Sequence, residues 1–240
     1  MAGTTLIGGN VAKPIRVTLE IGPKDKKVVA VAPDWPGLER GAKTREDAIE
    51  RLRSYIHRYS RVAKLAKLGA EFDALKNLDV IEQYPGTGST DFWGISFAFS
   101  SIDQQAMSGV ELERELTLMQ ACWSFFDEVR RRVSAEMQKG PRGGGRDRDH
   151  IVRHVLHTEQ NWAKMIGVLN AGDAILTGQG LKAHREAYCR AIRDYHLQGR
   201  PAGKMAKWPL RFLIRHTAFH TLDHAWEMED KDLTVKQAGG

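Results

Sequence analysis

The sequence has only two cysteines among its 240 residues, Cys122 and Cys189. Two cysteines are too few for a disulfide framework, and neither has a cysteine neighbour that would make a metal-binding or redox pair. We therefore expect both to be buried apolar residues.

Long hydrophobic runs are missing as well. No apolar stretch is long enough to span a bilayer. The N-terminus does not show the charged residues followed by an apolar run that are typical of a secretory leader. The hydrophobic fraction of 42% is nevertheless enough for an ordinary core. These features predict a globular, cytoplasmic protein that has no membrane partner.

The fingerprints of several enzyme classes are also absent. No nucleophile elbow, P-loop or dinucleotide-binding glycine pattern occurs where a strand would meet a helix. This argues against serine hydrolase and nucleotide chemistry. The net charge of +6 permits an acidic partner, but basic and acidic residues are interspersed along both halves of the chain.

The N-terminal part has the pattern of a small α+β unit after a leader at residues 1–13. An alternating stretch, a turn and a β-branched stretch predict a hairpin, and Thr44 followed by Glu46 and Asp47 predicts the start of a helix. The expected elements are strands at 16–21, 27–31, 77–84 and 92–99, and a helix from 44 to about 69. We assign residues 14–100 to this unit.

The turn and helix start in this unit resemble a known fold. The sequence Pro-Asp-Trp-Pro-Gly at 33–37, followed by Gly-Ala-Lys-Thr-Arg-Glu-Asp-Ala at 41–48, is similar to the HicB-type module of HicB antitoxins. The likeness covers roughly residues 14–68 and implies a fold more than an activity. In antitoxins this module occludes a toxin, usually beside a DNA-binding segment, and we find no such segment here.

A row of arginines on the predicted helix leaves a nucleic-acid partner open. Arg51, Arg58 and Arg61 fall on the solvent side of the helix. They are either a contact surface for nucleic acid or an ordinary solvated face.

After Ser100 the pattern becomes helical. Ser108 and Glu111 form a capping box, and the apolar periodicity predicts helices at 108–139, 147–169, 181–197 and 208–230. Four helices on short connections predict an antiparallel four-helix bundle over residues 101–235. The fold class is therefore α+β, a small sheet-and-helix module followed by a bundle.

The fourth helix contains three histidines at four-residue steps, His216, His220 and His224. This spacing stacks side chains along one side of a helix. With about 100° per residue, His224 lies within the apolar arc, His220 at its edge and His216 further out. The pattern favours His220 and His224 as an inward pair that binds metal, although a core histidine bonded to a neighbour has the same pattern.

Three large aromatic residues recur on the other side of this helix. Phe212, Phe219 and Trp226 follow one another at seven-residue steps. A surface helix does not normally expose such a row to water. The cover is either another domain of this chain or a second copy of it, which would make a homodimer.

The second helix supplies a third candidate ligand, His154, which flanks that helix's apolar arc, whereas His150 and His157 point toward solvent. Facing helices would bring His154, His220 and His224 together, and three protein ligands leave a position open, as in catalytic zinc sites. Asp223, Glu227 or Glu159 either orients an imidazole or is a surface charge.

These histidines resemble those of a known superfamily. A His-x-x-x-x-Glu element from His154 to Glu159, and His-x-x-x-His from His220 to His224, are similar to the DinB/YfiT-like four-helix-bundle metalloproteins. The likeness spans roughly residues 108–231. It implies a divalent metal, often zinc or nickel, and in several members a transferase or isomerase that uses bacillithiol, mycothiol or glutathione.

The chemistry implied is a metal-dependent enzyme, such as a thiol S-transferase or a related hydrolase or isomerase. A divalent metal lowers the pKa of a bound water or thiol and so provides a nucleophile at neutral pH. Arg142, Arg146, Arg148 and Arg153 near the start of the second helix are either a groove for an anionic thiol or the surface arginines of a glycine-rich loop. The alternative function is a non-enzymatic binding or regulatory module with a protein or nucleic-acid partner.

Overall fold

The computed structural model describes residues 13–75, 77–141, 143–199 and 208–234. The predicted leader up to residue 12, Arg142, the predicted connection at 201–203 and the last residue of the predicted bundle, at 235, lie outside the described residues.

The N-terminal part forms a mixed four-stranded sheet. Strands β1 (Ile15–Ile21), β2 (Val28–Val31), β3 (Glu39–Ala42) and β4 (Leu78–Pro85) lie in the order β3-β2-β1-β4. The β1–β2 and β2–β3 pairs are antiparallel, whereas β1 and β4 are parallel. The predicted hairpin is confirmed. Strand β3, which the sequence analysis did not predict, forms the edge next to β2.

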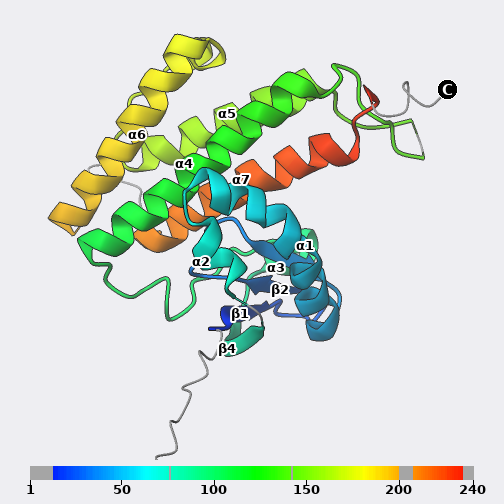
Figure 1. Cartoon of the computed structure of the whole chain (residues 1–240), viewed down its shortest axis with the longest axis vertical. Helices are drawn as coiled ribbons and strands as arrows, with labels where there is room; N and C mark the ends of the chain where they lie inside the picture. Colours follow the sequence, from blue (N-terminus) through cyan, green and yellow to red (C-terminus); the bar gives the residue numbers. More distant parts are fainter. Residues whose placement is uncertain (1–12, 76, 142, 200–207, 235–240) are drawn as a thin grey trace, which may run out of the picture.

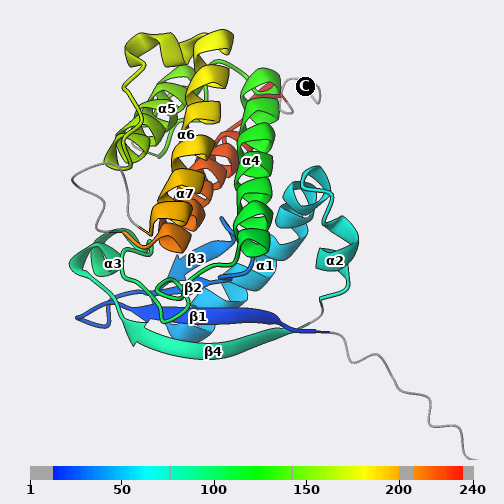
Figure 2. The ribbon, with the colours of Figure 1, turned by 90° about the vertical axis from the view of Figure 1, so that its left-hand side faces the viewer.

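Helix α1 (Arg45–Leu65) packs against β2 and β3 and is followed by the short helix α2 (Gly69–Asp73). The predicted start of α1 is confirmed, because the Thr44 side chain accepts a hydrogen bond from the backbone N–H of Asp47. Figure 2 shows the four long helices above the sheet, with α1 beside α4.

The strand predicted at 92–99 is wrong. Helix α3 (Gly88–Trp93) occupies the start of this segment and ends at Gly94. The loop that follows is held by the buried carboxylate of Glu20, which accepts hydrogen bonds from the backbone N–H groups of Phe97 and Ala98, both at 3.1 Å. Because these donors bond a side chain, they do not enter a strand ladder.

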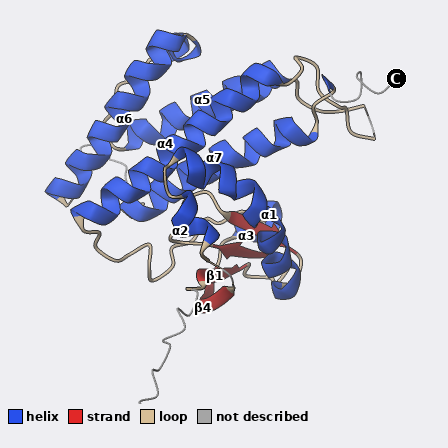
Figure 3. Cartoon of the chain, in the orientation of Figure 1, coloured by secondary structure: helices blue, strands red, loops and turns tan. Residues whose placement is uncertain are grey.

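The C-terminal part contains four long helices, α4 (Gly109–Arg132), α5 (Arg148–Met165), α6 (Gly178–Gln198) and α7 (Leu210–Asp230), and a 3₁₀ helix η1 (Gly172–Leu176) (Figures 1 and 3). Two predicted ends were too late. Helix α4 stops at Arg132 and the chain returns to pair Met137 with Asp232. Helix α5 stops at Met165, so Leu169 is 89% exposed rather than part of an apolar arc.

Helix α7 is covered on nearly all sides. The three aromatics that the sequence places opposite its apolar arc, Phe212, Phe219 and Trp226, are at most 5% exposed. The ring of Trp226 lies 5.1 Å from that of Tyr55 in α1, and the ring of Phe212 lies 4.8 Å from that of Phe99. The cover is therefore the N-terminal part of the same chain.

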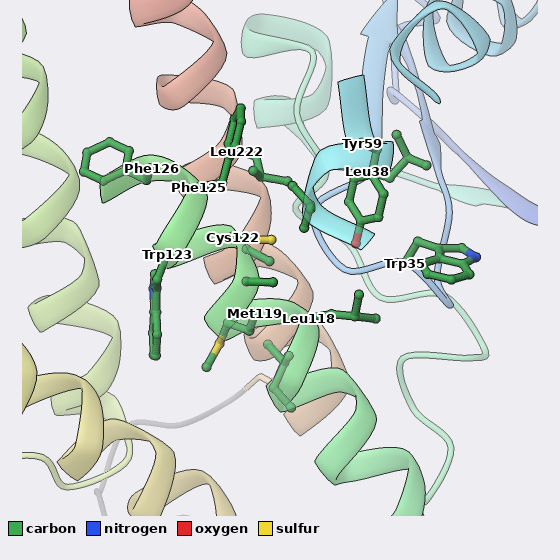
Figure 4. Close-up of a cluster of buried hydrophobic side chains, with 14 of the residues drawn as sticks. Trp35, Leu38, Tyr59, Leu118, Met119, Cys122, Trp123, Phe125, Phe126 and Leu222 are labelled. Atoms are coloured by element: carbon green, nitrogen blue, oxygen red, sulfur yellow. The ribbon is translucent and has the colours of Figure 1, made fainter. Parts of the chain in front are cut away.

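One hydrophobic core continues across the predicted boundary at residues 100 and 101. Figure 4 shows Trp35 and Tyr59 from the N-terminal part beside Cys122 of α4 and Leu222 of α7. The Tyr59 hydroxyl donates to the backbone carbonyl of Pro36 at 2.8 Å and so has a partner inside this core. Both halves of the chain contribute to a shared interior.

The predicted row of arginines is not a free basic face. Arg58 pairs with Glu229 at 2.8 Å and with Asp230 at 2.9 Å, and Arg61 pairs with Glu128 at 2.9 Å. These pairs connect α1 to α7 and α4. Two of the three cations that the nucleic-acid alternative needs are thereby neutralised within the chain.

Both cysteines are free and buried, as the sequence predicts. Burial raises the pKa of the Cys122 thiol and that of the Cys189 thiol. Within the described residues, we find no helix with the length and apolar character needed to cross a membrane.

Candidate metal centre

Helices α5 and α7 bring the three predicted ligands together. One ligand atom from each of His154, His220 and His224 lies within 4.8 Å of the other two. The Nε2 atoms of His154 and His220 are 3.1 Å apart. The ring centroid of His224 is 5.0 Å from that of His154 and 4.6 Å from that of His220.

The local structure explains this convergence. His220 and His224 are one turn apart on α7, and α5 packs against α7 so that His154 faces them. The indole of Trp162, two turns after His154 on α5, lies 5.1 Å from the ring of His220. His224 is buried, whereas His154 and His220 are half-buried, so the cluster borders solvent.

The surroundings keep two of these imidazoles neutral. Burial lowers the pKa of His220 well below its ordinary value, and the neighbouring His224 and His154 lower it further. Burial also lowers the pKa of His154, with His224 and Arg146 acting in the same direction. A neutral imidazole has a free lone pair, which is the form that binds a metal.

Glu227 fixes the orientation of the third imidazole. Its Oε2 atom lies 2.6 Å from His224 Nδ1. Burial raises the pKa of Glu227, but the hydrogen bonds from His224 and Lys231 outweigh burial and bring it to about 2. An ionised carboxylate only accepts, so His224 Nδ1 must donate, and Nε2 is the nitrogen of His224 left to face a metal. The prediction that Glu227 orients an imidazole agrees with this contact.

Two cations share the same carboxylate. Lys231 Nζ lies 2.6 Å from Glu227 Oε1, and Arg146 Nη2 lies 3.2 Å from Glu227 Oε2. Of the other arginines predicted near the site, Arg148 pairs with Asp149 at 2.8 Å, and Arg153 is exposed. Of the three that the structure describes, only Arg146 is joined to the cluster by a hydrogen bond.

The other two predicted carboxylates lie elsewhere. Asp223 contacts Arg40 at 3.3 Å on the neighbouring face of α7. Glu159 is buried beside Arg185, at 3.3 Å, and its Oε1 is 3.5 Å from Nε2 of His184. Neither contacts the histidine cluster, so the orienting role proposed for them from the sequence is wrong in this structure.

His216, expected to lie furthest out, is the most buried of the three histidines of α7, at 2% exposure. Its ring stacks on Phe212 with centroids 5.0 Å apart and lies 4.9 Å from the ring of Trp162. The apolar arc predicts one buried face for this helix, but α7 is covered on nearly all sides, so the arc does not show which of its residues are exposed. His216 is thus a core residue outside the cluster.

The sequence reasoning missed the contact of Trp162 with His220 and the role of Lys231. The i, i+4 spacing of Glu227 and Lys231, next to His224, was the available signal for the second of these.

The arrangement presents three imidazoles at the border of the protein, and one of them, His224, is oriented by a carboxylate. In comparisons with known proteins, no family model, no curated protein and no solved structure matches this chain.

Proposed function

We propose that this chain binds one divalent metal ion through His154, His220 and His224 and is a metal-dependent enzyme. The observation behind the proposal is the convergence of three imidazoles from two helices, with ligand atoms within 4.8 Å of one another. Helix spacing alone brings two of them together. The third comes from another helix, which makes a chance cluster a weaker explanation.

The distances fit such an ion. Zinc–imidazole bonds of about 2.0–2.1 Å at tetrahedral angles place two ligand nitrogens about 3.4 Å apart. The separation of His154 Nε2 and His220 Nε2 is 3.1 Å. A ring nitrogen of His224 lies within 4.8 Å of a nitrogen of each of the other two. Zinc or nickel is the expected metal, because imidazole suits both and the cluster has no thiolate.

Three protein ligands leave one coordination position for water or a small-molecule substrate. When bound, the metal would lower the pKa of a water or thiol there. The chain's residues hold the His154 and His220 imidazoles neutral, orient His224 through Glu227, and place Arg146 where it favours an anion. A low-molecular-weight thiol is the proposed cosubstrate. The thiol must come from outside the chain, since burial keeps Cys122 and Cys189 protonated.

The fold supports a family assignment only as part of this proposal. The four long helices α4 to α7, with histidines on the second and fourth, agree with a DinB-like four-helix bundle. The hairpin, the turn at 33–37 and α1 agree with a HicB-like unit in front of it. A thiol S-transferase is the activity that this pair of resemblances favours.

Cobalt substitution tests the open position directly. We expect the Co²⁺-loaded protein to develop a thiolate-to-cobalt charge-transfer band when glutathione is added, and none with S-methylglutathione, which lacks the thiol. His154→Ala should take up no stoichiometric cobalt. A wild-type protein that takes up neither cobalt, zinc nor nickel would overturn the proposal, and a loaded protein with no thiol-dependent band would exclude the thiol.

A further inference from the structure

A second site lies where α3 and β3 approach α7 (Figure 2). It is a pocket of about 280 Å³, separate from the histidine cluster. We call it the β3–α3 pocket. The side chains that matter in it are Lys27, Arg40, Lys43, Arg51, Trp93 and Asp223.

The pocket holds more positive charge than the described part of the chain neutralises, since Arg40 contacts Asp223 at 3.3 Å and the other cations have no such partner there. Four cations line it and only one carboxylate, Asp223, does so. Lys27 Nζ donates to the backbone carbonyl of Phe92 at 2.6 Å, and Arg51 Nη1 donates to that of Gly41 at 2.8 Å. Lys43 is exposed. Among the described residues, none of these three side chains forms an ion pair with a carboxylate.

This differs from the arginines elsewhere in the molecule. Arg58 and Arg61 on the same helix as Arg51 are paired with carboxylates, and Arg193 on α6 is paired with Glu113 at 2.7 Å. Like charges that face one another without counter-charges repel, so an unpaired cluster is unfavourable until an anion binds.

Arg40 supplies a fixed cation to the pocket. It is only 4% exposed, and its guanidinium lies 3.7 Å from the ring centroid of Tyr55 and 4.4 Å from that of Trp226. Its Nη1 donates to the Glu39 carbonyl at 2.8 Å, while its Nε and Nη2 have no hydrogen-bond partner. Burial lowers the pKa of Arg40, Asp223 raises it, and Arg51 lowers it further. A bound anion would offset both the burial of the Arg40 charge and its repulsion from Arg51.

An aromatic platform stands at the rim. Trp93 and Phe92 are 66% and 68% exposed, and their rings pack edge to face with centroids 4.4 Å apart. Their position is fixed by the chain around them. A Cβ at Gly41 would lie 2.1 Å from the carbonyl oxygen of Gly94, so glycine at 41 allows the end of α3 to approach β3.

We propose that the β3–α3 pocket binds a small phosphorylated compound that carries an aromatic ring, the chemistry of a nucleoside monophosphate. The phosphate contacts Lys27, Lys43 and Arg51, and the ring stacks on Trp93. Cation clusters beside exposed aromatic rings are the usual surface for this chemistry. No glycine-rich phosphate loop is involved, which explains why the sequence showed no nucleotide-binding fingerprint.

Calorimetric titration tests this proposal on the full chain at low ionic strength. The titrants are adenosine monophosphate, unphosphorylated adenosine, inorganic phosphate and a short single-stranded oligoadenylate. We expect the monophosphate to bind more tightly than adenosine or phosphate alone. Tighter binding of the oligoadenylate would also support the pocket and identify a strand as the source of the nucleotide.

Lysine and arginine variants locate the binding. Lys43→Gln with Arg51→Gln should weaken the monophosphate by about tenfold or more, since two charged phosphate contacts are lost. The matched control is Lys64→Gln with Arg53→Gln, which removes the same charges from exposed positions of α1 and should change affinity less than about twofold. Lys43→Gln alone alters no contact of the fold and should still weaken binding.

Trp93→Ala separates stacking from charge. It should weaken the monophosphate about fivefold to tenfold while leaving inorganic phosphate unchanged. Absence of monophosphate binding by the wild type, or equal affinity in the Lys43/Arg51 pair of changes and its control, would overturn the proposal. The histidine cluster is untouched in all these variants, so the result does not depend on the metal.

Discussion

Helix α7 contains two buried polar clusters that differ in one respect. At Arg215 each guanidinium nitrogen has a hydrogen-bond partner. Arg215 is 1% exposed, its Nε and Nη2 donate to the two oxygens of Asp103 at 2.7 and 2.8 Å, and its Nη1 donates to Glu39 at 3.0 Å. At His220 and His224, five and nine residues further along α7, three imidazoles converge, with one ligand atom of each within 4.8 Å of the other two.

This difference separates a structural cluster from a binding cluster. The Arg215 cluster links α7 to β3 and to the loop after α3, and it is closed by charge. Burial raises the pKa of Asp103, but Arg215 and Ser100 outweigh burial and hold it below its ordinary value. In the histidine cluster, by contrast, the rings of His154 and His220 face each other with their Nε2 atoms 3.1 Å apart, and His224 contacts the carboxylate of Glu227. In the function we propose, a metal ion would occupy the space between these imidazoles.

The largest effect on the free energy of unfolding is expected at the Arg215 cluster. Arg215→Ala should lower the free energy of unfolding by about 3–5 kcal/mol, because the Asp103 carboxylate remains buried without its counter-charge and Glu39 loses its hydrogen-bond donor. Urea denaturation measures this. Arg53→Ala, an exposed arginine of α1, should change the free energy of unfolding by less than about 0.5 kcal/mol. Equal effects of the two changes would show that the Arg215 cluster does not hold the halves together.

The histidine cluster should stabilise the protein only when it binds a metal ion. Zinc at 100 times its dissociation constant should raise the free energy of unfolding of the wild type by about 2.7 kcal/mol. His220→Ala should show no such gain, because it lacks a ligand. Thermal melting with and without zinc compares them. A gain of the same size in His220→Ala would place the metal elsewhere.

Loss of the orienting carboxylate should have a smaller effect. Glu227→Gln keeps the size of the side chain but makes it a poorer acceptor for His224 Nδ1–H, and it should weaken metal binding about 10-fold to 100-fold. Competition with a chelator measures this affinity. The matched control is Asp223→Asn. Asp223 precedes His224 by one residue but contacts Arg40, so this variant should bind metal as the wild type does.

The smallest effect concerns His216 and appears as a pH dependence. Burial, and to a lesser degree Arg215, lowers the pKa of His216 from 6.5 to about 3. Between these values the unfolded chain binds a proton that the folded chain does not, so the free energy of unfolding falls as pH decreases. His216→Phe removes this contribution, and the slope should become shallower by about 1.4 kcal/mol per pH unit. An unchanged slope in urea denaturation at pH 4 to 6 would show that His216 is charged in the folded protein.

Much of the fold was predictable from local patterns. The hairpin, the capping residues Thr44 and Ser108 and the four long helices depend on periodicity and on short-range hydrogen bonds, which the sequence displays directly. The failures came from long-range contacts. The loop at 94–100 depends on Glu20, some 76 residues away from Ser96, and no local pattern records that partnership.

The candidate site was predictable in its ligands and less so in its surroundings. Spacing and apolar arcs were enough to select His154, His220 and His224. They placed His216 wrongly because the N-terminal part covers the face that the arc argument left to solvent. Asp223 was assigned to the site by its position next to His224, whereas a one-residue step on a helix turns a side chain by about 100°.

Metal content by elemental analysis tests the central claim most directly. The protein is prepared without a histidine tag or chelator, and the wild type is compared with His154→Ala, His220→Ala and His224→Ala, with His216→Ala as the control histidine. The account predicts close to one zinc or nickel per wild-type and His216→Ala chain, and loss of that metal in the other three. A metal-free wild type that also fails to take up zinc or nickel would contradict it.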